Sequence, residues 1–292
     1  MGSRIRVAVI GLITTCVLFL AIASPAAAAP RLKHVWVVVL ENHSTGQILG
    51  NPQAPYLNKL ARRNGLATRY YSLDHPSLPN YLALISGSTH GCGSDSCKPN
   101  YGGPLLTRQL RHRHLAWRGY FQGLPHAGYV GGDKGSYVRH HNPFAYFTSI
   151  THSHHARRNI RPLTSLRHGL RHPPAFSLVV PDNQHNMHTG SIAKSDKWLR
   201  HWIPKIIHSR KFRHHSVLFI TFDEGHNDSS GCCIHGVHGG RTVLIAITSH
   251  RHHSRVNKPR SAYSLLRTIE SGFRLKPIAH ASRVRPLNGF WR

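Results

Sequence analysis

Acidic residues are scarce in this chain. Only 10 of its 292 residues are Asp or Glu, against 38 Lys and Arg, and the formal net charge is +28. The 27 histidines add further positive charge in mildly acidic surroundings. Such a surface attracts nucleic acid, anionic lipid or phosphate-bearing polymers irrespective of their sequence, although it is also compatible with a simple signature of solubility or habitat.

The chain also lacks the sequence features of multidomain, repeat and nucleic-acid-binding proteins. No Pro/Gly/Ser-rich linker divides the chain, and no internal repeat has the period of a solenoid or propeller. Residues 29–292 are therefore expected to form one large α/β domain, with two small domains as the alternative. No basic helix with interleaved aromatic residues occurs, which argues against specific nucleic-acid recognition. The sequence gives no indication of the oligomeric state.

The one long apolar stretch lies at the N-terminus. Residues 1–28 contain two arginines, an apolar segment over 7–23 and a run of alanines, in the order typical of a secretory signal peptide. A membrane anchor is the alternative, but the apolar segment is short and is followed by Pro25 and alanines rather than by a charged stop. We expect cleavage near Ala29 and a secreted protein.

Cysteines are few. One of the five, Cys16, lies in the predicted signal peptide, and Cys92, Cys97, Cys232 and Cys233 remain. An even number in an exported chain favours disulfides over a metal site. Three pairings are open, because each neighbouring couple could close on itself or cross-pair to tether two distant loops.

Apolar runs of strand length alternate with helix-like segments along the chain. This pattern predicts an α/β fold with a mostly parallel central sheet and helices on both faces. The segment 114–124 is expected to be extended and 131–175 rich in loops. The expected strands are 34–40, 176–180, 216–222 and 242–248, and the expected helices are 54–64, 80–85, 195–209 (with Ser195 as N-cap) and 262–271.

Four of the ten acids stand where apolar runs end. Glu41 ends the first run, Asp182 follows the run over 176–180, and Asp223 and Glu224 follow the run over 216–222. Strand ends commonly carry polar residues, but the carboxyl edge of a parallel sheet is also where open α/β folds bind ligands. Two adjacent carboxylates repel each other unless water or a cation intervenes. The pattern indicates a bound divalent metal ion.

Ser77 lies just before the helix expected over 80–85. A hydroxyl near a helix N-terminus and beside a divalent cation is easily deprotonated, which is the setting of a nucleophile. A plain helix cap is the alternative interpretation. The catalytic interpretation requires an accessible hydroxyl within ~10 Å of the Asp223–Glu224 pair, since coordination bonds are far shorter than that.

Five segments together resemble the bacterial phosphoesterases that include secreted acid phosphatases and phospholipases C, within the alkaline phosphatase superfamily. They are residues 34–44, 75–89, 180–199, 219–225 and 238–241. The resemblance implies an alkaline phosphatase-like fold. It also implies that Ser77 attacks phosphorus while Asn42 touches a phosphate oxygen. The residues implied around one metal ion are Glu41, Asn42, Ser77, Asp223 and Glu224.

Further site residues follow from the same resemblance. His188 and His238 are candidates for ligands of a second metal or for donors to the phosphate and the leaving oxygen, and Asp182 is a third candidate ligand. Members of the family often carry Asp where this chain has Asn186, which leaves open whether one or two metals bind. Oxygen ligands suit calcium, magnesium or manganese, and the histidines keep zinc open.

The sequence therefore predicts a secreted, metal-dependent phosphoric ester hydrolase of the acid phosphatase type. Ser77 would form a phosphoserine intermediate, and an imidazolium would protonate the leaving alcohol at low pH. A monoesterase is favoured because the chain stops soon after the catalytic domain. A phosphodiesterase or phospholipase C docked on anionic lipid or polymer is the alternative. A non-catalytic His-rich envelope protein that binds metal or polyanions is another.

Overall fold

The structure, a computed structural model, describes residues 2, 29–250 and 253–291. The predicted signal peptide lies outside these residues except for residue 2. The helices are α1 (Thr45–Ile48), α2 (Pro55–Arg63), α3 (Ser77–Ser86), α4 (Leu106–His112), α5 (Thr148–Thr151), α6 (His154–Arg157), α7 (Leu166–Gly169), α8 (Ile192–Ile207) and α9 (Ala262–Gly272). Short 3-10 turns cover Arg139–His141, Pro143–Tyr146, Leu163–Ser165, Ala279–Arg283 and Asn288–Trp291.

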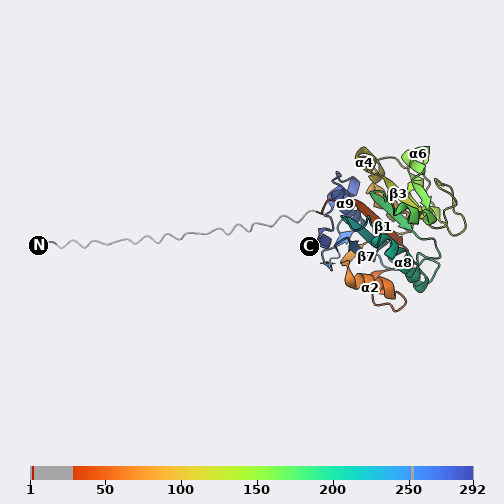
Figure 1. Ribbon diagram of the computed structural model, residues 1–292. Coiled ribbons are helices and arrows are strands. Elements are labelled where there is room, and N and C mark those ends of the chain that lie inside the picture. The colour runs from red at the N-terminus through yellow and green to blue at the C-terminus, as the bar shows by residue number, and fades with distance from the viewer. Residues whose placement is uncertain (1, 3–28, 251–252, 292) are drawn as a thin grey trace.

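A nine-stranded sheet runs through the middle of the molecule in the order β4-β3-β5-β1-β6-β7-β2-β8, with β9 paired to β2 (Figure 1). Its strands are β1 (His34–Leu40), β2 (Gly65–Tyr71), β3 (Trp117–Phe121), β4 (Ile160–Pro162), β5 (Phe176–Val180), β6 (Ser216–Phe222), β7 (Arg241–Thr248), β8 (Arg255–Val256) and β9 (Arg260–Ser261). All pairings are parallel except those of β7 with β6 and β2. The expected mostly parallel sheet is confirmed.

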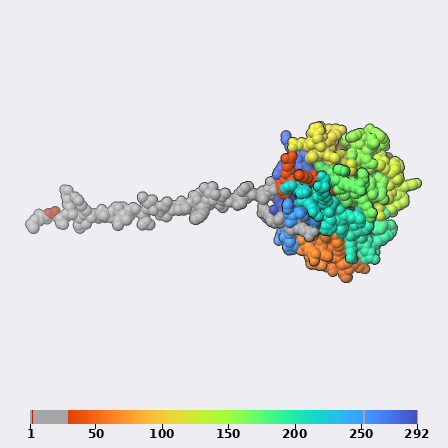
Figure 2. Space-filling view, viewed as in Figure 1, coloured from red at the N-terminus to blue at the C-terminus, as the bar shows by residue number. Residues whose placement is uncertain are grey.

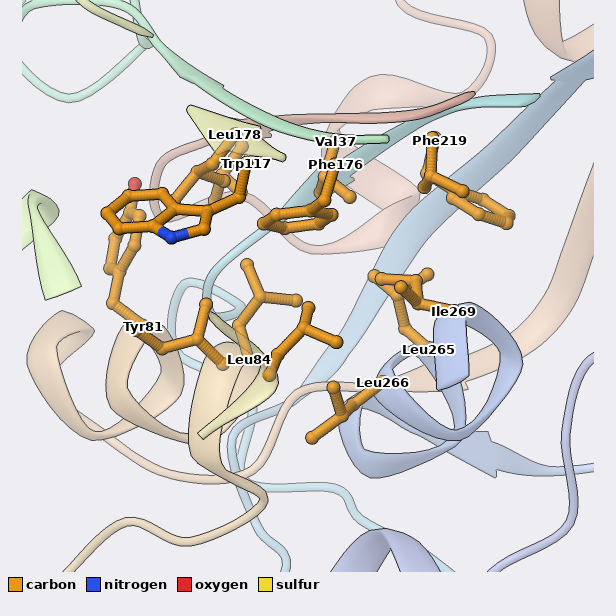
Figure 3. Packing of buried hydrophobic residues seen from close by; sticks show 14 of the residues in the cluster. Val37, Tyr81, Leu84, Trp117, Phe176, Leu178, Phe219, Leu265, Leu266 and Ile269 are labelled. Atoms are coloured by element: carbon orange, nitrogen blue, oxygen red, sulfur yellow. The ribbon is translucent and has the colours of Figure 1, made fainter. Parts of the chain in front are cut away.

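Side-chain alternation along the strands builds two cores. Val35, Val37 and Val39 of β1 point into one hydrophobic cluster, whereas Trp36 and Val38 point into the other. Because neighbours on a strand face opposite sides, each side of the sheet needs its own cover. The first cluster includes side chains of α3 and α9, which pack under β1, β5 and β6 (Figure 3). The second includes those of α2 and α8, whose surfaces adjoin in Figure 2 (orange and blue-green).

The structure departs from the sequence-based expectations in several elements: α1, α4, β8 and β9 were not expected, and three further departures have an identifiable cause. β2 was not expected, because Gly65 was interpreted only as the stop of the preceding helix. In the structure Gly65 begins β2, and a Cβ there would lie 2.6 Å from Phe290. The last helix before β6 begins at Ile192 with Ser191 as its N-cap, not at Ser195, because the Ser191 hydroxyl accepts a hydrogen bond from Lys194 N. The helix expected over 80–85 begins three residues earlier, at Ser77.

The four remaining cysteines form two local disulfides, Cys92–Cys97 and Cys232–Cys233. Of the three pairings open to the sequence, the structure has the one in which each couple closes on itself. None of the helices in the described part of the chain has the length and apolar character needed to cross a bilayer.

Candidate active site

The carboxyl edge of the sheet brings together residues that are far apart in the sequence. Glu41 follows β1, Asp223 and Glu224 follow β6, and Ser77 begins α3. The Ser77 hydroxyl lies 3.0 Å from Glu41 Oε2, 3.3 Å from Glu224 Oε1 and 3.5 Å from Asn42 Oδ1. The distance required between Ser77 and the Asp223–Glu224 pair is therefore met. We call Glu41, Asn42, Ser77, Asp223 and Glu224 the carboxyl-edge cluster.

The accessibility expected of Ser77 is not found, because the residue is only 2% exposed. Its hydroxyl is surrounded by the oxygens of Glu41, Asn42 and Glu224, which leaves little surface for solvent. Asn42 and His75 are partly exposed. A partly exposed face of the site therefore lies beside the enclosed hydroxyl.

Two polar side chains fix the loop and helix that carry Ser77. Asn80 Oδ1 accepts from Leu73 N at 2.8 Å and from Asp74 N at 3.2 Å, while Asn80 Nδ2 donates to the carbonyls of Asp74 and Pro76. Asp95 Oδ1 accepts from Leu78 N at 2.9 Å, at the first turn of α3. A carboxylate at this position satisfies a free helix N–H and interacts favourably with the helix dipole.

The carboxylates of the cluster are buried, which opposes their ionisation. Glu41 is 0% exposed, and Asp223 and Glu224 are each 5% exposed. Burial raises the pKa of Glu41 to about 7, even though the Tyr81 and Ser77 hydroxyls donate to it. Burial and the neighbouring Glu41 carboxylate raise the pKa of Asp223, and burial together with Asp223 raises that of Glu224. Desolvation thus outweighs the hydrogen bonds that favour the charged forms.

The donor set suits a hard divalent cation, because three carboxylates, an amide oxygen and a hydroxyl are the oxygen ligands such ions prefer. Asp223 Oδ1 accepts from Asn42 N and Glu224 N, but Asp223 Oδ2 is buried without a hydrogen-bond partner, and a cation would satisfy it. In the described residues, no three His, Cys, Asp or Glu side chains are yet arranged to hold a metal. Glu41 and Glu224 instead bond to Tyr81, Ser77 and His75.

Two histidines border the cluster in different electrostatic states. His141 Nε2 lies 3.2 Å from Glu41 Oε2 without forming a hydrogen bond, and burial lowers the pKa of His141 to about 4. His75 Nδ1 contacts Glu224 Oε2, and His75 Nε2 lies 3.1 Å from the Asp228 carbonyl. Burial lowers the pKa of His75, but the Asp228 carbonyl and the Glu224 carboxylate outweigh burial and raise it overall. His75 therefore holds a proton more readily than His141 does.

The other predicted site residues contact different partners. Asp182 accepts from Ser136 at 2.7 Å and pairs with His185 at 2.6 Å. His238 is exposed and pairs with Asp74 at 3.0 Å. His188 is also exposed, although partial burial of its ring, together with the nearby His141, lowers its pKa. Within the described residues, no hydrogen bond or ion pair joins these three to the carboxyl-edge cluster, so their role as ligands stays a prediction.

Four residues of the site were not identified from the sequence: Asn80, Tyr81, Asp95 and His141. Asn80 and Tyr81 lie on α3 itself, three and four residues after Ser77, so they are positioned with it once the helix begins at Ser77. Asp95 was visible as one of the ten acids, but it does not lie next to the end of a strand, which was the signal used for the other acids. His141 lies in the segment expected to be loop-rich, among many other histidines.

The chain is similar in sequence to known phosphoesterases over most of its length. The model of the Phosphoesterase family matches residues 51–276, a range that includes Ser77, Asp223 and Glu224 but begins after Glu41. A phosphatidylinositol-3-phosphatase from Mycobacterium tuberculosis is 30% identical over 91% of this chain and 85% of its own length. A phosphate-repressible acid phosphatase from Penicillium chrysogenum is 30% identical over 58% of this chain, which spans 43% of that relative.

Solved structures share the fold at much lower identity. The lipoteichoic acid synthase LtaP from Listeria monocytogenes superposes with a TM-score of 0.62 at 11% identity, over 91% of this chain and 78% of its own. A protein of the alkaline phosphatase superfamily from Vibrio parahaemolyticus superposes with a TM-score of 0.60 at 12% identity, over 88% and 73% of the two chains. The fold is thus that of the alkaline phosphatase superfamily, and the chain belongs to the Phosphoesterase family.

Proposed function

We propose that this protein is a metal-dependent phosphoric monoester hydrolase that works through a phosphoserine at Ser77. The observation that carries the proposal is the position of the Ser77 hydroxyl, at the start of α3 and within 3.5 Å of oxygens from Glu41, Asn42 and Glu224. The names of the relatives, which are phosphatases, support a monoester rather than a diester substrate.

In the first step, the Ser77 oxygen bonds to phosphorus and the bond from phosphorus to the alcohol oxygen breaks. The hydroxyl proton passes to a carboxylate oxygen that already accepts it, Glu41 Oε2 or Glu224 Oε1. The departing alcohol oxygen takes a proton from the His75 imidazolium, whose raised pKa keeps that proton available in mild acid. Asn42 would donate to a phosphate oxygen from the partly exposed side of the cluster.

In the second step, water bonds to phosphorus from the side that the alcohol left, and the bond between phosphorus and Ser77 breaks. The water proton passes to His75, and Ser77 recovers its proton from the carboxylate. The net reaction is ester plus water to alcohol plus phosphate. The carboxyl-edge cluster would hold a divalent cation, which when bound offsets the repulsion of the carboxylates, lowers the pKa of the hydroxyl and polarises the ester.

The test compares Ser77→Ala with Ser86→Ala, a substitution at the other end of the same helix. Ser86 donates to the Leu82 carbonyl and does not touch the carboxyl-edge cluster. We expect Ser77→Ala to lower hydrolysis of p-nitrophenyl phosphate by at least ~10³-fold while the fold is kept, and Ser86→Ala to stay active. Acid-quenched wild type should carry a covalent phosphate by intact mass, and Ser77→Ala should not.

Retained activity in Ser77→Ala would refute the assigned nucleophile. Faster hydrolysis of bis(p-nitrophenyl) phosphate than of the monoester would identify a phosphodiesterase instead. Full activity after dialysis against a chelator, with no increase on adding calcium, magnesium, manganese or zinc, would refute metal dependence. A protein that binds metal but cleaves neither ester would fit the non-catalytic alternative.

A further inference from the structure

The acids are distributed very unevenly between the two edges of the sheet. All ten lie in the part of the chain that the structure describes. Asp196 and Glu270 are buried, where Asp196 accepts from the first-turn amides of α2 and Glu270 accepts from Ile278 N. The other eight lie in segments at the carboxyl edge, on the side of Ser77: Glu41, Asp74, Asp95, Asp133, Asp182, Asp223, Glu224 and Asp228.

The opposite edge, where the parallel strands begin, carries exposed basic residues and, among the described residues, no exposed acidic side chain. The segments entering β1, β5 and β6 lie side by side there, because Lys33 N donates to the His215 carbonyl at 2.8 Å and Val35 N to that of Ala175 at 2.7 Å. We call the exposed basic residues of these three segments the amino-edge surface. They are Arg31, Lys33, Arg171, Arg210, Lys211 and Arg213.

These charges have no internal counter-charge. Across residues 29–250 and 253–291, every ion pair to an Asp or Glu comes from a histidine, so none of the six basic side chains is neutralised in this way. A concentrated field of one sign raises the local concentration of polyanions and steers them to the surface. The amino-edge surface therefore has the electrostatic property of a polyanion-binding site.

The shape of this surface favours a chain over a sheet-like partner. A hollow of about 530 Å³ lies between the segments entering β5 and β6, lined by Leu170, Arg171, His172, Ser209, Arg210 and Lys211. A thin polymer can enter such a hollow, whereas the plane of a bilayer contacts only its rim. The large apolar residue of the loop 209–215, Phe212, is 3% exposed and cannot insert into lipid as an anchor.

We propose that the amino-edge surface binds a linear polyanion with phosphate repeats. The binding leaves the opposite edge uncovered by the polymer, so the polymer holds the protein in place while small phosphate esters reach the carboxyl-edge cluster. This docking role is separate from the proposed catalytic function and does not depend on it.

The test measures binding of a fluorescently labelled long-chain inorganic polyphosphate by anisotropy at several salt concentrations. One variant combines Arg210→Gln, Lys211→Gln and Arg213→Gln. The matched control combines Lys98→Gln, Lys134→Gln and Lys194→Gln, three exposed lysines in segments on the carboxyl-edge side, and loses the same net charge. Vesicles of anionic and of neutral lipid are titrated in parallel.

We expect the amino-edge variant to bind polyphosphate at least about tenfold more weakly than the control does. Its plot of log K against log salt should flatten by about 2, because three lost contacts each contribute about 0.7 on a flexible single-stranded polyanion. Equal losses in both variants would show that net charge alone acts and would overturn the proposal. Failure of the wild type to bind polyphosphate would overturn it too. Tighter binding of anionic vesicles, lost in the amino-edge variant, would reassign the surface to a membrane.

Discussion

Replacing Glu41 with Gln should remove a pH-dependent destabilisation of the metal-free protein. Glu41 is fully buried, and burial raises its pKa from 4.5 to about 7. The folded state therefore binds this proton more tightly than the unfolded state does. The resulting stabilisation is complete below pH 4.5 and is lost as pH rises to about 7. The change across that window corresponds to about 3 kcal/mol of unfolding free energy.

Histidines act in the opposite direction over much of the same range. Burial lowers the pKa of both His140 and His141 from 6.5 to about 4, so unfolding takes up protons there and their contribution to stability rises with pH. The absolute pH dependence of the wild type thus mixes opposing terms. The informative quantity is the difference in unfolding free energy between Glu41→Gln and the wild type, measured by urea titration in chelator at each pH.

Glu270→Gln is the matched control for this experiment. Glu270 is also fully buried, and burial raises its pKa to about 8, but it lies on α9 and contacts Ile278 rather than the carboxyl-edge cluster. Both variants should gain stability relative to the wild type as pH rises. A divalent cation at 100 times its Kd should stabilise the wild type and Glu270→Gln by about 2.7 kcal/mol, and Glu41→Gln by clearly less. A difference between Glu41→Gln and wild type that does not change with pH, or equal stabilisation of all three proteins by the cation, would refute the reasoning.

Two further substitutions test how the site is held. Asp95→Ala removes the acceptor for Leu78 N at the start of α3. The lost cap, worth about 1 kcal/mol, should lower kcat about fivefold with little change in KM. An unchanged kcat would show that Asp95 does not position Ser77. Asp196→Ala removes the acceptor for the backbone amides of Tyr56 and Leu57 and should lower the free energy of urea unfolding by about 1–2 kcal/mol. It should leave kcat unchanged, because α2 lies away from the carboxyl-edge cluster. A fall in its kcat at urea concentrations too low to unfold the variant would contradict that separation.

Much of the sheet could be predicted because its central strands are buried on both faces. β1, β5 and β6 are continuous apolar runs, which is typical of parallel strands covered by helices on either side. β2 (GLATRYY) lacks such a run and contains Arg69, since it lies near the edge of the sheet between β7 and β8. Its pairing with β7 also shifts register between Ala67 and Tyr70. Local composition does not specify a strand of this kind, because its position depends on partners far along the chain.

The acids of the carboxyl-edge cluster could be predicted, because they follow strands and parallel strands end at one edge, whereas Asn42 was identified only from the family resemblance and Ser77 mainly from it. Asp182 follows β5 in the same way but bonds to Ser136 and His185 instead.

The side-chain contacts inside the cluster could not be predicted. Whether Ser77 is open or enclosed depends on side chains such as Tyr81, which approaches from α3 and donates to Glu41. The raised pKa of His75 likewise depends on the Asp228 carbonyl, which the loop after β6 brings within 3.1 Å.

Net charge alone would suggest the wrong electrostatics for this site. A protein of +28 should favour ionised carboxylates, yet the pKa values of Glu41, Asp223 and Glu224 are all raised. In the part of the chain that the structure describes, most basic residues that produce the charge are exposed and none forms an ion pair with a carboxylate, and salt screens them beyond about 8–10 Å. Burial acts on the carboxylates directly and is not screened. The cluster should therefore respond to protons and to a bound divalent cation much more strongly than to ionic strength.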